Sequence, residues 1–401
     1  MRVDRRVFLL TAAAAAACSW KRERSSLARA AQYLWAQQAA DGGFHSATYG
    51  LLRSGQSLTP FVLGALLRVP DATVPAPDGA VDRAIAFIRR HTSVDGAVGV
   101  TGGGADYPNY ATALAVDALV AAQRTLPAPA GAVDGAIAFI RRHTSDDGTV
   151  GRTGGDADYP NYATALAVDA MVTAQRPSWT GDIAPMVARL RAEQFGEVNG
   201  WTPEHTAYGG WGMGGTIRRP PDAGHVDLSM TRFVLEALRA SGVPGSDHAM
   251  TRARMYLERS QNHDGGFCFS PVMPALNKAG QSADGFVSYG TTTADGVLAL
   301  RASGLPDSDD RIARAIEWLD RNHQPDRVPG FNERESPHQS WSTGLRFYYA
   351  AAISRVRPHQ PVLLPEQADD GSFRNANGRV KEDDPLIATA FAIHVLTRAG
   401  R

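Results

Sequence analysis

The strongest constraint on the fold is an internal duplication. Residues 84–96 and 136–148 are nearly identical in sequence, and so are residues 107–119 and 159–171. In each pair the second copy starts 52 residues after the first, at 136 against 84 and at 159 against 107. One helix–turn–helix unit has been copied whole, and such a unit cannot bury its apolar face without neighbouring units. The duplication therefore predicts a repeat protein.

Fainter copies of the unit extend over the rest of the chain, and each is marked by a glycine turn. The glycine usually follows an aspartate and precedes an aromatic residue. Seven such turns can be recognised: Asp41–Phe44, Asp95–Gly96, Asp147–Gly148, Asn199–Trp201, Asp264–Phe267, Pro329–Phe331 and Asp370–Phe373. Aspartate before glycine suits a turn, because aspartate hydrogen-bonds nearby backbone and glycine accepts a positive φ.

Helical spacing surrounds these turns. Apolar residues such as Ala31, Leu34 and Trp35 precede a turn at helical intervals, and a second helix with Leu or Ala along one face follows it. A Gln or His often stands a few places before the glycine: Gln38, Gln194, Gln261, His323 and Gln367. Strand signals are scarce. The pattern predicts an all-α chain of about fourteen helices in about seven hairpins. Neither end carries the polar capping repeat that an open solenoid needs, so we expect a closed ring.

Length and composition agree with one repeat domain. A chain of 401 residues suggests two or three domains, but the repeat continues through the places where linkers would fall. We therefore expect a single domain over residues 27–401. The formal net charge is zero, which argues against nucleic acid as a partner. Only Cys18 and Cys268 are present, so helix packing rather than a disulfide is expected to stabilise the mature chain.

Residues 1–26 have the features of an export signal. Arg5 and Arg6 precede Val-Phe-Leu-Leu in a twin-arginine pattern, and an alanine run follows, ending at Cys18. The apolar stretch is too short to span a bilayer but suits the core of a signal peptide. Cys18 also resembles a bacterial lipoprotein cleavage site, although Ala15 stands where such sites usually carry Leu. These features predict export to the periplasm or cell envelope, with lipid attachment at Cys18 as a route to the membrane.

The repeat resembles that of a known superfamily. Residues 31–44, in which AQYLWAQQ is followed by DGGF, are similar to the aromatic-Leu, Gln, Gly, aromatic repeat of squalene cyclases and protein prenyltransferase β subunits. Residues 254–267 are similar, and residues 314–331 are a looser copy. The resemblance covers roughly residues 27–398 and implies an α/α toroid, with inner and outer helices around a central cavity.

Terpenoid cyclases of this superfamily protonate an alkene with a carboxylic acid and hold the carbocation among aromatic faces. Their acid belongs to an Asp-x-Asp-Asp-Thr-Ala motif at a helix start. The nearest stretches here are residues 156–159 and 382–385, and neither runs directly into Thr-Ala. An isoprenoid-processing enzyme on this chain would therefore need displaced catalytic residues.

The prenyltransferases instead use zinc held by Asp, Cys and His, with a fourth position open. Asp284 lies in a segment that resembles the one with the family's Asp and Cys, but Phe286 occupies the cysteine position. His338 falls about where the family's His stands. Because two ligands do not complete a tetrahedral site, we expect no bound zinc and no other cofactor.

Aromatic and polar side chains are dense in the loops between the first and second helices. If the ring closes, loops from distant units meet at one mouth of the cavity and form a ligand site there. The candidate ligand-binding residues are His45, Tyr107, Tyr159, His205, Trp211, Asp284, Tyr289, His338 and Trp341. The expected ligand is a small molecule, apolar or isoprenoid. Three functions remain open: a non-catalytic binding protein, an isoprenoid-processing enzyme, and a carbohydrate-active toroid in which carboxylates or a Tyr base carry the chemistry.

Overall fold

The fold is taken from a computed structural model. It describes residues 25–92, 108–125, 137–138, 140–141, 144–146, 148–150, 159–175, 179–283, 285–324, 326–331, 340–357 and 364–399. In these residues the only strands are the two-residue β1 (Gln281–Ser282) and β2 (Gly285–Phe286), which form an antiparallel hairpin. Almost all other regular structure is helical, as the repeat pattern predicts.

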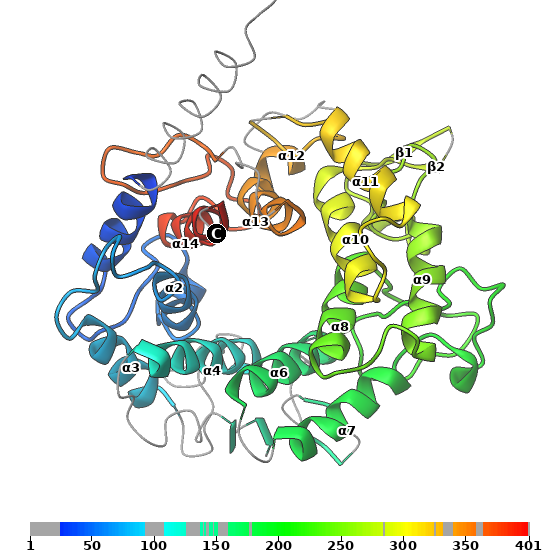
Figure 1. Ribbon diagram of the computed structural model, residues 1–401, viewed down its shortest axis with the longest axis horizontal. Helices are drawn as coiled ribbons and strands as arrows, with labels where there is room; N and C mark the ends of the chain where they lie inside the picture. Colours follow the sequence, from blue (N-terminus) through cyan, green and yellow to red (C-terminus); the bar gives the residue numbers. More distant parts are fainter. Residues whose placement is uncertain are drawn as a thin grey trace, which may run out of the picture.

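In the part of the chain that the structure describes, seven inner helices surround a central cavity. They are α2 (Leu58–Leu66), α4 (Pro108–Thr125), α6 (Pro160–Ala174), α8 (Leu228–Ala240), α10 (Gly290–Ala302), α13 (Arg346–Val356) and α14 (Pro385–Ala399). Each packs against the next, and α14 packs against α2, so the ring is closed (Figure 1). The prediction of a closed α/α toroid is confirmed.

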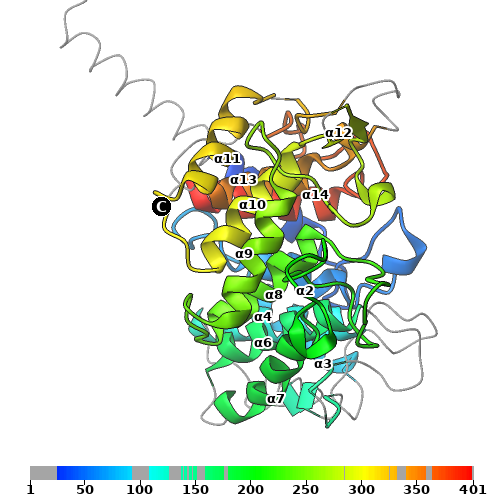
Figure 2. The same ribbon diagram turned by 90° about the vertical axis from the view of Figure 1, so that its right-hand side faces the viewer.

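The outer helices cover the inner ring. They are the helix over residues 25–36, α3 (Ala80–Arg90), α7 (Trp179–Ala192), α9 (His248–Ser260) and α11 (Asp310–Arg321), together with helical residues 137–138 and 140–141. Figure 2 shows α9 and α11 lying over α8 and α10 on one flank. The short elements are α12 (Trp341–Gly344), η1 (Gly50–Leu52), η2 (Glu197–Asn199) and η3 (Pro274–Leu276). No helix in the described ranges has the length and hydropathy needed to cross a membrane.

The last unit departs from the predicted hairpin. Its glycine turn and inner helix are present, but residues 364–384, between α13 and α14, contain no helix. This stretch holds Pro365, Gly371 and Gly378 among several Asn and Asp residues, a composition that favours turns over helix.

A repeated pair of glutamine hydrogen bonds joins successive units. Gln38 Nε2 donates to the carbonyl of Gly42 in its own turn, at 3.0 Å, and to the carbonyl of Ala80, at 2.8 Å, where the next outer helix begins. Gln194, Gln261 and Gln367 each make the equivalent pair of bonds, to their own turn and to the start of the next outer helix. For Gln367 the next helix is that of residues 25–36, so this bond closes the ring.

A threonine on five of the inner helices fixes the other side of the turn. The backbone N–H of the second residue after the turn's first glycine donates to its Oγ1, as Phe44 does to Thr59 at 2.9 Å. The same bond joins Val150 to Thr164, Trp211 to Thr231, Phe267 to Thr293 and Phe373 to Thr389.

These bonds correct the turn predicted for the fourth unit. The sequence placed it at Asn199–Trp201, but Gln194 bonds to Gly209, and Trp211 is the residue that donates to Thr231. Residues 199–208 are an insertion that carries its own Asn-Gly-Trp, and this local likeness produced the wrong assignment.

Candidate functional site

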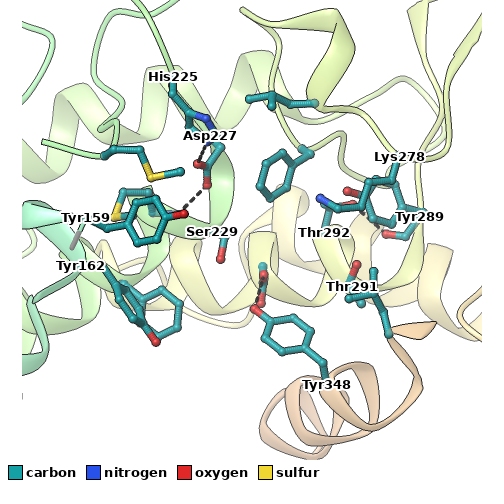
Figure 3. A pocket seen from close by; sticks show the side chains of 17 residues that line it. Tyr159, Tyr162, His225, Asp227, Ser229, Lys278, Tyr289, Thr291, Thr292 and Tyr348 are labelled. Carbon is teal, nitrogen blue, oxygen red and sulfur yellow. Dashed lines mark hydrogen bonds and ion pairs between the residues drawn. The ribbon is translucent and has the colours of Figure 1, made fainter. Parts of the chain in front are cut away.

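The N-terminal ends of α6, α8 and α10 line a cavity of about 440 Å³, here called the aromatic pocket (Figure 3). Its lining residues are Tyr159, Tyr162, Met213, His225, Asp227, Ser229, Met230, Phe233, Phe269, Leu276, Lys278, Tyr289, Thr291, Thr292, Asp295, Leu345 and Tyr348. Ligand pockets in proteins usually measure about 300 to 1,000 Å³ and are mostly apolar with a few placed polar groups. The aromatic pocket fits that description.

The repeat explains why these side chains point inward. Tyr162, Ser229 and Thr291 each stand two positions before the threonine that binds the turn of their unit, and all three line the pocket. Because that threonine faces the turn from the first part of its helix, the residue two places earlier is turned toward the ring interior. This position relative to a Thr-Ala or Thr-Arg pair is a sequence signal for the pocket.

Asp227 is a buried carboxylate in the pocket wall. It caps α8, where one carboxylate oxygen accepts the N–H of Met230 at 2.7 Å. The other oxygen lies 2.6 Å from His225 Nε2, and the aspartate is almost completely buried. A carboxylate with hydrogen-bond partners at both oxygens is held in a fixed position beside the cavity.

A buried ion pair forms the floor of the same pocket. Arg232 Nη1 lies 3.2 Å from Asp295 Oδ1, and the Tyr348 hydroxyl donates to Asp295 Oδ2 at 3.1 Å. Burial raises the pKa of the Asp295 carboxyl, and the Arg232 guanidinium opposes that shift. The guanidinium also lies 4.2 Å from the Phe233 ring centroid, and Phe233 meets Tyr162 edge to face. These contacts fix the aromatic rings that face the cavity.

Tyr289 and Lys278 place polar groups in the apolar lining. Tyr289 is buried, and its hydroxyl has no hydrogen-bond partner among the described residues. Burial raises the pKa of Tyr289 well above its usual value. The Lys278 ammonium lies 4.1 Å from the Phe269 ring centroid and 5.2 Å from that of Trp341, and burial lowers its pKa. Both polar groups are available to orient a ligand.

The structure places the sequence-predicted residues in three groups. Tyr159 and Tyr289 line the aromatic pocket, and Trp341 lies behind it against Lys278. Tyr107, Asp284 and His338 lie outside the described residues. The remaining three, His45, His205 and Trp211, are held in the packing of turns.

The turn contacts of those three are specific. His45 Nδ1 lies 2.9 Å from the carbonyl of Arg53, and its Nε2 lies 3.1 Å from Asp41. His205 Nδ1 accepts the N–H of Thr202 at 3.1 Å. Trp211 is fully buried and donates through Nε1 to the carbonyl of Leu190 at 2.6 Å.

The pocket residues that were not singled out from the sequence include Asp227, Lys278, Asp295 and Tyr348. Asp227 precedes its unit's turn-binding threonine by four positions and could have been found from that spacing. Asp295 and Tyr348 lie within helices, where the repeat pattern does not predict which positions carry polar side chains. In the described ranges no three His, Cys, Asp or Glu side chains are grouped to hold a metal ion.

A second cavity of about 780 Å³, here called the arginine chamber, lies at the opposite, C-terminal ends of the inner helices. It is lined by Arg68, Ala165, Leu166, Asp169, Phe233, Glu236, Ala237, Arg239, Ala240, Leu298, Arg301, Ala302, Arg355, His394 and Arg398. Phe233 also lines the aromatic pocket, so this ring separates the two cavities. An adjoining cavity shares Arg68, Asp169 and His394 with the chamber and adds Asp117 of α4.

Asp117 is expected to make folding depend on pH. Burial, aided by Asp169, raises the pKa of Asp117 to about 7, against the opposing effect of Arg68. The folded state therefore binds more protons than the unfolded state between about pH 4 and pH 7, and stability falls as the pH rises through this window. Asp117→Asn removes the ionisation. Since the side chain borders an open cavity, we expect the variant to be roughly 2 kcal/mol more stable than wild type at pH 8.

Urea unfolding of the two proteins at pH 4.5 and pH 8 measures this effect. The advantage of the Asn variant should shrink at the lower pH, where the Asp117 carboxyl is protonated in wild type too. A constant difference at both pH values would show that Asp117 does not titrate in this range.

Comparison with known proteins adds a sequence relative and a fold. The chain is 28% identical to drimenyl diphosphate synthase of Streptomyces showdoensis over 213 residues, which are 46% of this chain and 35% of the synthase. The match thus spans about a third of the relative's length. No protein-family model matches the chain.

Solved structures with the same architecture carry different activities. An inactive variant of the GH76A α-1,6-mannanase of Salegentibacter sp. HEL1_6, in complex with α-1,6-mannotriose, superposes with a TM-score of 0.50 at 10% identity, over 95% of this chain and 99% of that one. The type II terpene cyclase MstE of Scytonema, in complex with merosterolic acid A, gives a TM-score of 0.46 at 14% identity, over 95% and 98%. At these identities the structural likeness shows the fold alone. The chain is thus an α/α-toroid protein that resembles the terpenoid cyclase superfamily.

Proposed function

We propose that the chain binds an apolar ligand of the isoprenoid class in the aromatic pocket. The lining of that pocket carries the proposal: six aromatic rings, two Met and two Leu side chains surround a cavity of about 440 Å³. Such a surface recovers free energy from burying hydrocarbon, at about 25 cal/mol per Å² of apolar area. The curated relative is named for a terpenoid diphosphate, which supports the same ligand class.

A carbohydrate is the less well supported ligand. Sugars need many hydrogen bonds, and both carboxylates of the pocket are already engaged: Asp295 with Arg232 and Tyr348, and Asp227 with His225 and a helix N-terminus. The mannanase shares the toroid at 10% identity, which supports the fold and not the substrate.

Filling the pocket is expected to abolish ligand binding. Thr291 is buried at the start of α10 and faces the cavity (Figure 3), so Thr291→Trp places an indole where the ligand would lie. We expect farnesol to bind the variant at least about tenfold more weakly than wild type, a loss of about 1.4 kcal/mol. Isothermal titration calorimetry with farnesol measures this.

The matched control adds the same ring outside the cavity. Thr251→Trp lies on the exposed face of the outer helix α9 and should leave farnesol binding unchanged. If both variants bind farnesol as wild type does, the aromatic pocket is not the site. If wild type binds α-1,6-linked mannotriose and not farnesol, the ligand is a carbohydrate and the proposal is wrong.

A second candidate function is proton-initiated conversion of that ligand, and the His225–Asp227 pair favours it. In this reaction the Asp227 carboxyl gives its proton to one alkene carbon of the ligand, a C–H bond forms and the π bond breaks. The N–H of Met230 and the His225 ring stabilise the carboxylate that remains. The ring faces of Tyr162, Phe233 and Tyr348 surround the cation, and loss of a proton from a neighbouring carbon to Asp227 restores the acid.

Asp227→Asn separates this reaction from binding. Asn caps a helix about as well as Asp, so α8 should remain intact. We expect conversion of an isoprenoid alkene, followed by gas chromatography of extracts, to fall by about a hundredfold or more, because a positioned acid contributes that much. Binding of farnesol should stay within a few fold of wild type. If wild type and Asp227→Asn convert the alkene equally well, Asp227 is not the acid of this reaction.

We also propose that residues 1–26 direct export, with lipid attachment at Cys18 as the anchor to the cell envelope. The twin-arginine pattern supports this. Replacing Arg5 and Arg6 by Lys should retain the protein in the cytoplasm in cell fractionation. Labelled palmitate should be incorporated by wild type and not by Cys18→Ser.

A further inference from the structure

Lys278 provides an amine in the wall of the aromatic pocket, and the residue before it holds its loop in place. The loop joins η3 to β1. The backbone N–H of Phe269 donates to Asn277 Oδ1 at 2.8 Å, and Asn277 Nδ2 donates to the carbonyl of Ser270 at 2.7 Å. These bonds fix the loop against the pocket, so that Lys278 lines the cavity. Figure 3 shows Lys278 on the opposite side of the pocket from Tyr162.

The surroundings of the Lys278 ammonium are aromatic. In the part of the chain that the structure describes, no carboxylate forms an ion pair with it, and it lies against the rings of Phe269 and Trp341. Burial lowers the pKa of Lys278, and the charge of Asp227, which lines the same pocket, opposes that shift. A lysine desolvated among apolar groups gives up its proton more readily, and the neutral amine is a nucleophile.

Lysine is rare in this chain. Arginine supplies 38 of the 41 Lys and Arg residues, and the lysines are Lys21, Lys278 and Lys381. A cation that only packs on aromatic faces is more often arginine, and Arg379 lies 4.6 Å from the centroid of the same Trp341 ring. Arginine stays charged and does not act as a nucleophile, whereas a buried lysine does both chemical jobs. Packing on the rings therefore does not account for a lysine at position 278.

We propose that Lys278 binds an isoprenoid aldehyde covalently, as an imine, in the aromatic pocket. The amine nitrogen attacks the carbonyl carbon, so that a C–N bond forms and the electron pair of the C=O π bond moves to the oxygen, which takes a proton. The hydroxyl group then leaves as water. This water carries the aldehyde oxygen and the two hydrogens of the amine, and a C=N bond remains. The reaction needs neither an oxidant nor a reductant.

The rest of the pocket suits this chemistry. The Tyr289 hydroxyl is buried in the same lining and has no hydrogen-bond partner among the described residues. Burial raises the pKa of Tyr289, so the hydroxyl keeps its proton and can donate it in a hydrogen bond to a carbonyl oxygen. The apolar walls also keep out water, which hydrolyses imines. The inference rests on the proposed function, since the apolar lining selects the chain that carries the aldehyde.

Reductive trapping with farnesal tests the inference. The full chain is incubated with farnesal and sodium cyanoborohydride, which reduces an imine to a stable secondary amine, and peptide mass spectrometry locates the product. We expect one farnesyl group on Lys278, formed at least about tenfold faster than on Lys381, because the pocket brings the aldehyde to the amine. Excess farnesol and the Thr291→Trp substitution should each slow modification of Lys278 by about tenfold or more and leave that of Lys381 unchanged.

Two lysine variants complete the experiment. Lys381→Arg is the matched control, because Lys381 also lies near a ring, 5.8 Å from the Tyr49 centroid, but does not line the aromatic pocket. This variant should be modified on Lys278 as wild type is. Lys278→Arg keeps a cation beside the rings and should acquire no farnesyl group in the pocket. Circular dichroism shows whether Lys278→Arg is folded, and if it is not, the wild-type reaction with and without excess farnesol decides.

Three outcomes would overturn the inference and leave the proposed function standing. In the first, farnesol binds wild type but farnesal leaves Lys278 unmodified. In the second, Lys278 and Lys381 are modified equally fast, which indicates general reactivity of amines. In the third, neither excess farnesol nor Thr291→Trp slows modification of Lys278, which shows that the aldehyde does not react from the aromatic pocket.

Failure of the proposed function gives a different result. In that case farnesol does not bind wild type, and the short aldehyde butanal is trapped on Lys278 as efficiently as farnesal is. This result rejects an isoprenoid as the ligand, for the proposed function and for the inference alike.

Discussion

Gly209→Ala is expected to destabilise the ring by about 2 to 5 kcal/mol. Gly209 has a φ of +90°, a conformation that costs an L-residue about 1 to 2 kcal/mol. A Cβ there would also lie 2.0 Å from the carbonyl oxygen of Arg252 on the next outer helix, so α9 must move away. Overpacking of this kind costs about 1 to 3 kcal/mol more. Because the Gln194 bonds join the same turn to α9, the displacement separates two units.

The control for this prediction isolates the steric part. Gly242 has nearly the same φ, +92°, but nothing lies within 4 Å of a Cβ built on it. Gly242→Ala should therefore cost only the conformational 1 to 2 kcal/mol or so. Urea unfolding followed by circular dichroism compares the two variants. If both lose the same stability, close approach of the turn to the next helix is not what holds adjacent units together.

The same turns show why the fold could be predicted from the sequence. The Gly and the preceding Gln recur because the Gln side chain bonds both to the turn and to the next unit, as Gln38 does to Gly42 and Ala80. The second residue after the turn's first glycine bonds instead to the inner helix of its own unit, as Phe44 does to Thr59. Residues that make the same hydrogen bonds in each unit recur at regular intervals in the sequence. The fourth turn was misplaced because residues 199–208 contain a similar Asn-Gly-Trp sequence that does not make these hydrogen bonds.

The site was harder to predict than the ring. The residues directly after a glycine turn, such as His45, are used to hold the turn itself. The residues that face the cavity come later, two positions before the turn-binding threonine, as Ser229 does before Thr231. The amino-acid composition of a loop does not distinguish residues that hold the turn from residues that face the cavity. The hydrogen bond from the turn to the threonine shows which part of the loop points inward.

The arginine chamber shows a further limit of sequence reasoning. Arg239 and Arg398 stand at helix ends, where an arginine is expected for electrostatic reasons on any helix. Nothing in the chain order indicates that these ends meet. Ring closure between α14 and α2 brings them to one cavity, and closure is a property of the packed structure.

Asp295→Asn is expected to cost about 3 to 5 kcal/mol of stability at pH 7. The substitution keeps an oxygen that can accept the Tyr348 hydroxyl but leaves Arg232 buried beside a neutral group. Removing one partner of a buried pair is expensive, because the remaining charge has lost its compensation. The loss should appear as a lower urea midpoint with an unchanged helical content.

The double variant Arg232→Met, Asp295→Asn tests whether the pair or the individual side chains matter. Without a buried charge, the double variant should lose clearly less stability than the two single variants together, because residues in contact are not additive. Arg232→Met alone leaves the Asp295 carboxyl buried without the guanidinium beside it. Burial already raises the pKa of that carboxyl, so the stability lost by this variant should grow as the pH rises. The alternative result is that the stability losses of the two single variants add up to that of the double variant and do not depend on pH. Arg232 and Asp295 would then stabilise the pocket independently, and the ion pair would not hold the rings of the aromatic pocket in place.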